Sequence, residues 1–307
     1  MECRWLASLA AAATVALALT ATCATAAPRS GADVTVERAT IHVDFDRGDF
    51  TDPAAVLEWV RRSAQTVSAY YGRFPADAVT LRLVPSAGGG VHGGRTYANR
   101  GAFIRVGLGR EVTAAQLRDD WVLVHEMTHL ALPDTGETHA WLSEGIATYV
   151  EGIARVHARS RSEADVWEEE FRSMPRGLPS PGDRGLDYTH SWGRTYWGGA
   201  MFCLLADVDI RRRTALRFGL QDALRAVLSA SGGLAADWPI ERVLRTGDAA
   251  VGTRTLEELY TRMKAGPETP DLAALWRQLG VEADGDDVRF DEQAPLAPVR
   301  RAIMGAQ

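Results

Sequence analysis

The segment Trp121-Val-Leu-Val-His-Glu-Met-Thr-His-Leu130 contains the pattern His125-Glu126-x-x-His129 inside a run of residues that predicts a helix. Helical residues i and i+4 lie on one face about one turn apart, so the two imidazoles can reach a common point. Glu126 then lies beside that point without having to be a ligand. Two neutral nitrogen donors, with a carboxylate that can take a proton from water, are what a hydrolytic zinc site requires. The alternative for the motif alone is a pair of structural histidines.

A second helix, predicted from 140 to about 158, supplies a candidate third ligand. It contains Trp141-Leu-Ser-Glu-Gly-Ile-Ala-Thr-Tyr149, and its Glu144 would project toward the first helix if the two pack together. The fourth position would stay open for water, which distinguishes a catalytic zinc site from a closed structural one. His139, near the start of this helix, is a competing ligand.

The surrounding chain predicts an α+β fold: a small N-terminal mixed sheet with helices, followed by an all-α half. Periodicity predicts the strands and helices, and Thr113 with Gln116 forms a capping box that should begin the helix of the histidine motif. Asp134 and Glu137 are expected in a solvated turn. Strands are expected at 34–45, 78–84 and 102–106, a glycine-dense loop at 88–94, and helices at 53–71, 196–208, 214–229, 254–264 and 271–280.

Length and composition favour a single domain over residues 33–300, with sub-domains at 33–158 and 186–300. A net charge of −6 and the lack of a basic cluster with aromatic residues argue against nucleic-acid binding.

Residues 1–27 are typical of a secretory signal peptide, with a small-residue cleavage site at Ala24-Thr25-Ala26. We therefore expect a secreted, periplasmic or envelope location; an uncleaved membrane anchor is the alternative. After cleavage only Cys203 is left, which excludes an internal disulfide.

Beyond these local patterns, the sequence resembles a known group of enzymes. The histidine motif followed by Trp-Leu-x-Glu-Gly-x-Ala resembles the gluzincin metallopeptidases of the MA clan. The segment 195–211 resembles the Tyr-x-Lys-Gly-Ala region of the glycyl aminopeptidase and aminopeptidase N families. The tail, from 272 to 280 and on to 297, is similar to the end of the glycyl aminopeptidase catalytic domain. The resemblance covers roughly residues 100–300.

This resemblance implies a thermolysin-like catalytic domain that binds one zinc ion. It implies that His125, His129 and Glu144 are the zinc ligands, that Glu126 is the general base, and that Tyr196 stabilises the transition state. The chemistry is consistent, since zinc brings the pKa of its water to about 7 and a carboxylate in reach can collect the proton. A phenol donor stabilises an oxyanion as its charge develops.

The sequence also departs from those families. Gly198 stands where they have a lysine, and no Gly-x-Met-Glu-Asn segment, whose glutamate holds the substrate's free amine, precedes the histidine motif. The expected substrate edge offers His92, Arg95 and Arg105 instead of a carboxylate. The N-terminal β domain of the larger enzymes is not in this sequence. These departures favour an endopeptidase over an aminopeptidase.

Three further residues are weaker candidates for the site. Thr148 and Glu151 follow Glu144 on the same helix face and could orient the ligands or face the substrate, the alternative being a solvated or capping role. His190 is a candidate second oxyanion donor, or an imidazolium that faces substrate, the alternative being a loop histidine without a task.

The sequence thus predicts a zinc-dependent metallopeptidase with a peptide or protein substrate. Two other functions stay open at this point. One is a catalytically inactive gluzincin-fold binding protein. The other is a zinc amidase that acts on a non-peptide or cell-wall amide.

Overall fold

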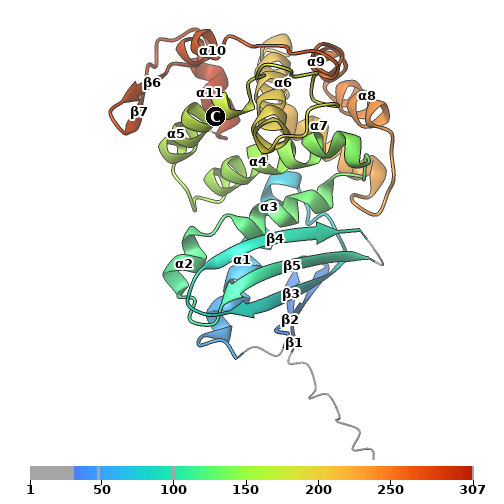
Figure 1. Ribbon diagram of the computed structural model, residues 1–307, viewed down its shortest axis with the longest axis vertical. Coiled ribbons are helices and arrows are strands. Elements are labelled where there is room, and N and C mark those ends of the chain that lie inside the picture. The colour runs from blue at the N-terminus through green and yellow to red at the C-terminus, as the bar shows by residue number, and fades with distance from the viewer. Residues whose placement is uncertain (1–30, 47–48, 99–100, 306–307) are drawn as a thin grey trace, which may run out of the picture.

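The computed structural model describes residues 31–46, 49–98 and 101–305, and its N-terminal part contains a five-stranded sheet (Figure 1). The strand order is β1-β2-β3-β5-β4. The three inner strands are parallel to one another, whereas β1 and β4 pair antiparallel at the two edges. The predicted mixed sheet is therefore confirmed. The strands are β1 Gly31–Val36, β2 Ala39–Asp44, β3 Ala78–Ser86, β4 Val91–Tyr97 and β5 Ala102–Gly109.

The single strand predicted at 34–45 is wrong, because the chain reverses within it. β1 and β2 form a hairpin in which Val36 pairs with Ala39. At the turn, Glu37 adopts a φ of 54° and its carboxylate accepts a hydrogen bond from the backbone N–H of Phe74. Glu37 and Arg38 carry none of the usual glycine or asparagine signals of such a turn. A distant contact therefore stabilises a turn that the local sequence does not indicate.

Helix α1 (Pro53–Tyr71) fits its sequence signals closely. The side chain of Asp52 accepts a hydrogen bond from the N–H of Ala55 at 2.9 Å, and Pro53 occupies the first turn, where its missing N–H costs nothing. Its apolar face is buried and contacts β1, α3 and α4. The helix thus anchors the sheet to the two helices that carry the histidine motif and Glu144.

The helix predicted from Thr113 through the histidine motif is two helices. The capping box forms, but it begins α2 (Ala114–Asp119). The chain then turns at Asp120, whose ψ of 138° is extended, and α3 (Val122–Thr128) follows. The Asp120 carboxylate accepts hydrogen bonds from the N–H groups of Val122 and Leu123 at 3.1 and 3.2 Å, and one from the Trp59 indole at 3.0 Å. Asp120 therefore caps α3 and fixes its direction.

The rest of the described chain is mainly helical and lies on the opposite side of α3 from the sheet (Figure 1). Helix α4 packs against α3 and α6. The prediction missed α5, α8, α11 and the small β6–β7 hairpin. The elements are α4 Ala140–His157, α5 Glu163–Ser173, α6 Gly199–Arg213, α7 Leu220–Ser231, α8 Ile240–Val251, α9 Thr255–Met263, α10 Leu272–Leu279, β6 Val281–Asp284, β7 Asp287–Phe290 and α11 Ala297–Ile303.

Two expectations concern the start of the chain and membranes. The predicted signal peptide at 1–27 lies outside the described residues. Among the helices that the structure describes, none is long and apolar enough to cross a bilayer.

Candidate metal centre

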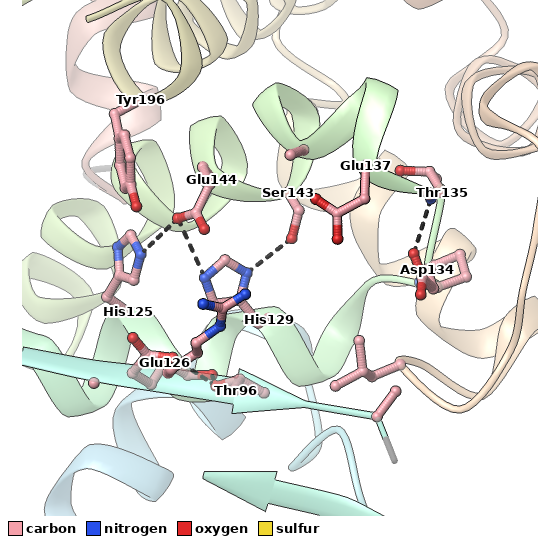
Figure 2. Close-up of a pocket in the computed structure, with 17 residues that line it drawn as sticks. Thr96, His125, Glu126, His129, Asp134, Thr135, Glu137, Ser143, Glu144 and Tyr196 are labelled. Atoms are coloured by element: carbon pink, nitrogen blue, oxygen red, sulfur yellow. Dashed lines mark hydrogen bonds and ion pairs between the residues drawn. The ribbon is translucent and has the colours of Figure 1, made fainter. Parts of the chain in front are cut away.

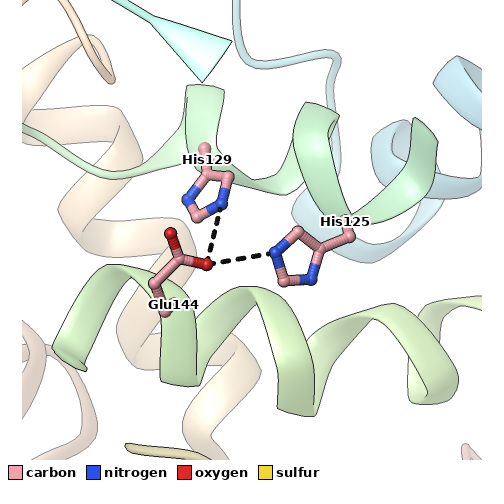
Figure 3. A group of neighbouring side chains, drawn as sticks. All are labelled: His125, His129 and Glu144. Atoms are coloured by element: carbon pink, nitrogen blue, oxygen red, sulfur yellow. Dashed lines mark hydrogen bonds and ion pairs between the residues drawn. The ribbon is translucent and has the colours of Figure 1, made fainter. Parts of the chain in front are cut away.

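The three predicted ligands meet between α3 and α4 (Figure 3). His125 and His129 project from α3 and from the 3-10 turn after it, and Glu144 projects from α4. The Glu144 Oε2 lies 3.2 Å from the His125 Nε2 and 3.5 Å from the His129 Nε2. One ligand atom from each residue lies within 4.8 Å of the others.

This donor set fits a zinc ion. Two donor atoms bound tetrahedrally to zinc at about 2.0–2.1 Å lie about 3.3 Å apart, close to the observed separations. Burial alone would raise the pKa of Glu144, but hydrogen bonds from His125 and His129 hold it well below its usual range. Glu144 is therefore an anion at neutral pH. A divalent cation would compete with the protons that the imidazoles otherwise share with it.

The charge of the site also acts on His129. Burial tends to lower the pKa of this imidazole, but the hydrogen bond and negative charge of Glu144, with the charge of Glu126, raise it. The His129 Nδ1 lies 2.8 Å from the Ser143 Oγ, a contact that leaves Nε2 facing Glu144. Ser143 thus holds the ring of a candidate ligand, and the sequence analysis did not predict it although it directly precedes Glu144.

Glu126, the predicted base, is held by strand β4. The Thr96 hydroxyl lies 2.7 Å from the Glu126 Oε2 and 2.8 Å from its backbone oxygen. Beside Thr96, a Cβ added to Gly94 would lie 2.5 Å from the Glu126 Cγ. Only glycine leaves room for the carboxylate there. Part of the predicted loop 88–94 is therefore a strand that supports Glu126, and neither Gly94 nor Thr96 was predicted.

Tyr196 reaches the same centre from a π-helical turn, η4 (Arg194–Gly198), that leads into α6. Its ring stacks on His125 with centroids 6.3 Å apart and planes 21° apart. Burial raises the pKa of the Tyr196 phenol, and the charges of Glu144 and Glu126 raise it further. The phenol is thus a neutral hydrogen-bond donor at physiological pH.

Facing glycines set the position of Tyr196 relative to Glu144. A Cβ on Gly145 would lie 2.3 Å from the backbone of Gly199, and one on Gly199 would lie 2.1 Å from the carbonyl oxygen of Trp141. Helices α4 and α6 therefore touch backbone to backbone. Gly198, where the resembling families have lysine, is also confined, since a Cβ would lie 3.1 Å from the Leu186 side chain.

The three candidate ligands, Glu126 and Tyr196 line one pocket of about 490 Å³ (Figure 2). Its walls come from β4, α3, α4, Tyr196 and the turn after α3. Asp134 and Glu137 are exposed, as expected, and also line this pocket, at the end away from Tyr196 as Figure 2 shows. Arg95 on β4 is exposed and also lines the pocket.

The remaining candidates lie around this pocket. Glu151 is buried and accepts a hydrogen bond from Arg155 at 2.9 Å, and Thr148 is half-buried beside it. Neither forms a hydrogen bond with a ligand residue in the described part of the chain. His139 contacts the Thr135 carbonyl oxygen through Nδ1 at 2.9 Å and is not part of the ligand group. His190 is exposed and does not line this pocket.

Comparison with known proteins shows which solved structures have a similar fold. No protein-family model matches the sequence, and no curated protein matches it significantly. The structure is similar to an aminopeptidase N family protein from Idiomarina loihiensis, with a TM-score of 0.60, 14% identity, and coverage of 83% of this chain and 49% of that one. It is also similar to an M1 zinc metallopeptidase from Deinococcus radiodurans, with a TM-score of 0.51, 17% identity, and coverage of 80% and 52%. The chain therefore has the fold of these structures and spans about half their length.

Proposed function

We propose that this protein is a zinc-dependent metallopeptidase. The observation that carries the proposal is the convergence of His125, His129 and Glu144 in an accessible pocket, with Glu126 held beside them. A non-ligand carboxylate at this place has no structural task that a neutral side chain could not perform. The shared fold with an M1 zinc metallopeptidase supports the same function. We likewise propose that the catalytic domain is thermolysin-like, as the sequence resemblance implies.

The residues of the pocket suggest how each would act. His125, His129 and Glu144 would hold one zinc ion, which when bound supplies Lewis acidity toward water and the scissile carbonyl. Glu126, fixed by Thr96, would accept the proton of the attacking water and return it to the leaving amine. Tyr196 would donate a hydrogen bond to the carbonyl oxygen as negative charge develops on it.

We propose an endopeptidase rather than an aminopeptidase. Strand β4 is the edge of the sheet next to α3, where an extended peptide could pair with it. Its residues Val91–Tyr97 include no carboxylate that could hold a substrate's amino terminus. The positive charge of Arg95 would repel a protonated amino terminus. An internal stretch of peptide carries no such charge.

An aminopeptidase is the second candidate, because Asp134 and Glu137 line the same pocket and could bind an amine. The I. loihiensis structure is also of the aminopeptidase N family. Peptides that differ only in N-terminal acetylation separate the two. Endopeptidase activity predicts cleavage of both at one internal bond; an aminopeptidase would release residues from the free peptide alone, and Glu137→Gln would weaken that release.

The decisive experiment combines metal analysis with cleavage of a peptide library. We expect one zinc per chain in the wild type and in Glu126→Gln, and less in His129→Ala and Glu144→Ala. Glu126→Gln should lower kcat by about 10²–10⁴-fold, since general base catalysis contributes about that much.

Two alternatives give different results in that experiment. Zinc binding without cleavage of any peptide, by wild type and Glu126→Gln alike, would favour a binding protein of this fold. Cleavage restricted to cell-wall amides, sensitive to Glu126→Gln, would favour a zinc amidase.

We also propose that the protein is secreted or lies in the cell envelope. The support is the apolar segment at 1–27 with its small-residue cleavage site. Determining the N-terminal residue of the protein isolated from its host would test this. An intact Met1 would contradict cleavage.

A further inference from the structure

A second cavity of about 190 Å³ lies next to the metal pocket. His125 and Tyr196 line both cavities, so the two share a wall made of a predicted ligand and the predicted oxyanion donor. The other walls come from the start of α3, the middle of α4, the end of α5 and the segment that leads into α6.

Aromatic rings form a continuous surface along the shared wall. Trp192 stacks on Tyr196 with centroids 5.7 Å apart and planes 26° apart, and Tyr196 stacks on His125. Trp121 meets His125 edge-on at 5.6 Å. Trp197, which is buried, closes another side. An incoming ring could stack or pack edge-on against this surface, the arrangements that aromatic pairs prefer.

The two outer indoles are unusually exposed. Trp121 is 52% and Trp192 57% exposed, whereas Trp59, Trp141 and Trp167 are almost fully buried. Exposed aromatic side chains that line a cavity are typical of a binding site. A ligand that covers the indoles removes their apolar surface from water, which favours binding.

The charges around the cavity disfavour a cationic occupant. Glu151 and Glu169 line it, but each is paired, with Arg155 at 2.9 Å and Arg161 at 2.6 Å. Arg176 also lines the cavity, is exposed, and has no ion pair in the described part of the chain. The free charge at the cavity is therefore positive and would repel a lysine or arginine side chain.

We infer that this cavity is a specificity subsite that takes a large apolar side chain, with aromatic side chains preferred. The inference rests on the proposed peptidase function and names its substrate class. A cavity below the roughly 300 Å³ of small-molecule sites holds one side chain rather than a whole ligand. Because its wall contains His125 and Tyr196, the side chain in it belongs to a residue that flanks the reacting carbonyl.

The cleavage test uses N-acetylated, C-amidated peptides that vary at one position beside the cleaved bond. The zinc-loaded wild type should cleave peptides with Phe, Tyr or Leu at that position best. Trp192→Ala should reduce the ratio of kcat/KM for Phe over Ala by about tenfold, since an apolar pocket discriminates by about that factor. Trp192→Phe should restore most of it. Tyr188→Ala, which removes an equally exposed aromatic ring that lines neither cavity, is the matched control.

The ratio of kcat/KM for Phe over Ala distinguishes a role of Trp192 in the subsite from a role in positioning Tyr196. If Trp192 only positioned Tyr196, its loss would lower kcat/KM for all peptides equally and leave the ratio unchanged, which would overturn the inference. No preference for apolar residues in the wild type would overturn it as well.

A binding test keeps the inference separate from the proposed function. Zinc-loaded Glu126→Gln should bind a fluorescein-labelled Phe peptide about tenfold more tightly than the Ala peptide, by fluorescence anisotropy. The double variant with Trp192→Ala should lose that difference. Absence of cleavage by the wild type would contradict the peptidase, whereas equal binding of the two peptides would contradict the subsite.

Discussion

Thr96 links the sheet to the chemistry of the pocket. Its hydroxyl contacts both the carboxylate and the backbone oxygen of Glu126. It therefore holds the Glu126 side chain close to the backbone of the same residue. Glu126 is 6% exposed and thus depends on this hydroxyl rather than on bulk water. A catalytic group that is held in place by a neighbouring element rarely adopts conformations that cannot react.

Thr96→Val should therefore lower kcat by about tenfold with little change in KM, because it removes the hydrogen bond and keeps the side-chain shape. Thr96→Ser retains the hydroxyl and should restore most of kcat. Steady-state kinetics on a cleaved peptide measure both. Unchanged zinc content in Thr96→Val is the control, and an unchanged kcat would contradict the positioning role.

Buried acids on α4 and α5 give the protein a pH-dependent stability. Burial raises the pKa of Glu151 from 4.5 to about 7, against the opposing charge of Arg155, and burial raises that of Glu170 in the same direction. The folded protein thus holds protons that the unfolded chain releases. For Glu151 this stabilisation is complete below about pH 4.5 and is lost as the pH rises toward 7.

Glu151→Gln should flatten this dependence. The wild type should lose on the order of 3 kcal/mol more than the variant in the free energy of unfolding between pH 4.5 and 7, because each pKa unit corresponds to about 1.4 kcal/mol. Urea unfolding of the chelator-treated proteins across this range measures the difference. Glu111→Gln, at an exposed position, is the control. Parallel curves for Glu151→Gln and wild type would contradict the prediction.

Among the elements, α4 and α6 contact each other beside the candidate site. Glu144 lies on α4, and Tyr196 lies in the turn that begins α6. Gly145 and Gly199 let the two backbones touch, so the separation of the ligand from the phenol follows directly from the absence of two side chains. The Trp-Leu-x-Glu-Gly and Tyr-Trp-Gly-Gly segments are therefore the two halves of one packing interface.

Gly145→Ala should separate these helices. The added Cβ meets backbone atoms, which cannot rotate away, so we expect a loss of about 1–3 kcal/mol in the free energy of unfolding together with lower kcat. Urea denaturation and peptide cleavage measure the two effects. Gly266→Ala is the matched control, since a Cβ there has no neighbour within 4 Å. Equal stability of the two variants would contradict the close packing.

In the molecule as a whole, the site joins the sheet to the helical half. One cluster of buried apolar residues runs from Val34 in β1 through α3 and α4 to Met304 after α11. The candidate ligands project from α3, the turn after it and α4, and apolar residues of these elements belong to this cluster. A metal bound between them is therefore expected to stabilise the whole fold rather than a local loop.

Zinc at about 100 times its dissociation constant should accordingly raise the free energy of unfolding by about 2.7 kcal/mol. Thermal unfolding followed by circular dichroism, with and without a chelator, measures the effect. Glu144→Ala should lose most of it. An equal zinc-dependent stabilisation of Glu144→Ala would show that zinc binds at another site.

Local patterns in the sequence were enough for the α+β class, for most of the helices and for the chemistry of the candidate ligands. The spacing of His125 and His129 is the i and i+4 spacing of a continuous helical segment, and Glu144 follows on the next helix, so short-range periodicity could indicate all three. The order of strands and helices likewise predicted the mixed sheet and the helical half. These features depend on residues close together along the chain.

The parts that only the folded chain shows depend on contacts between distant segments. Thr96 and Glu126 are 30 residues apart, and the wall of the second cavity joins Trp121 to Trp192. A glycine-dense stretch reads as a loop until β5 pairs with it and makes it a strand. Hydrogen bonds and packing across such separations leave no period in the sequence, because they are selected by the fit of two surfaces rather than by local backbone preference.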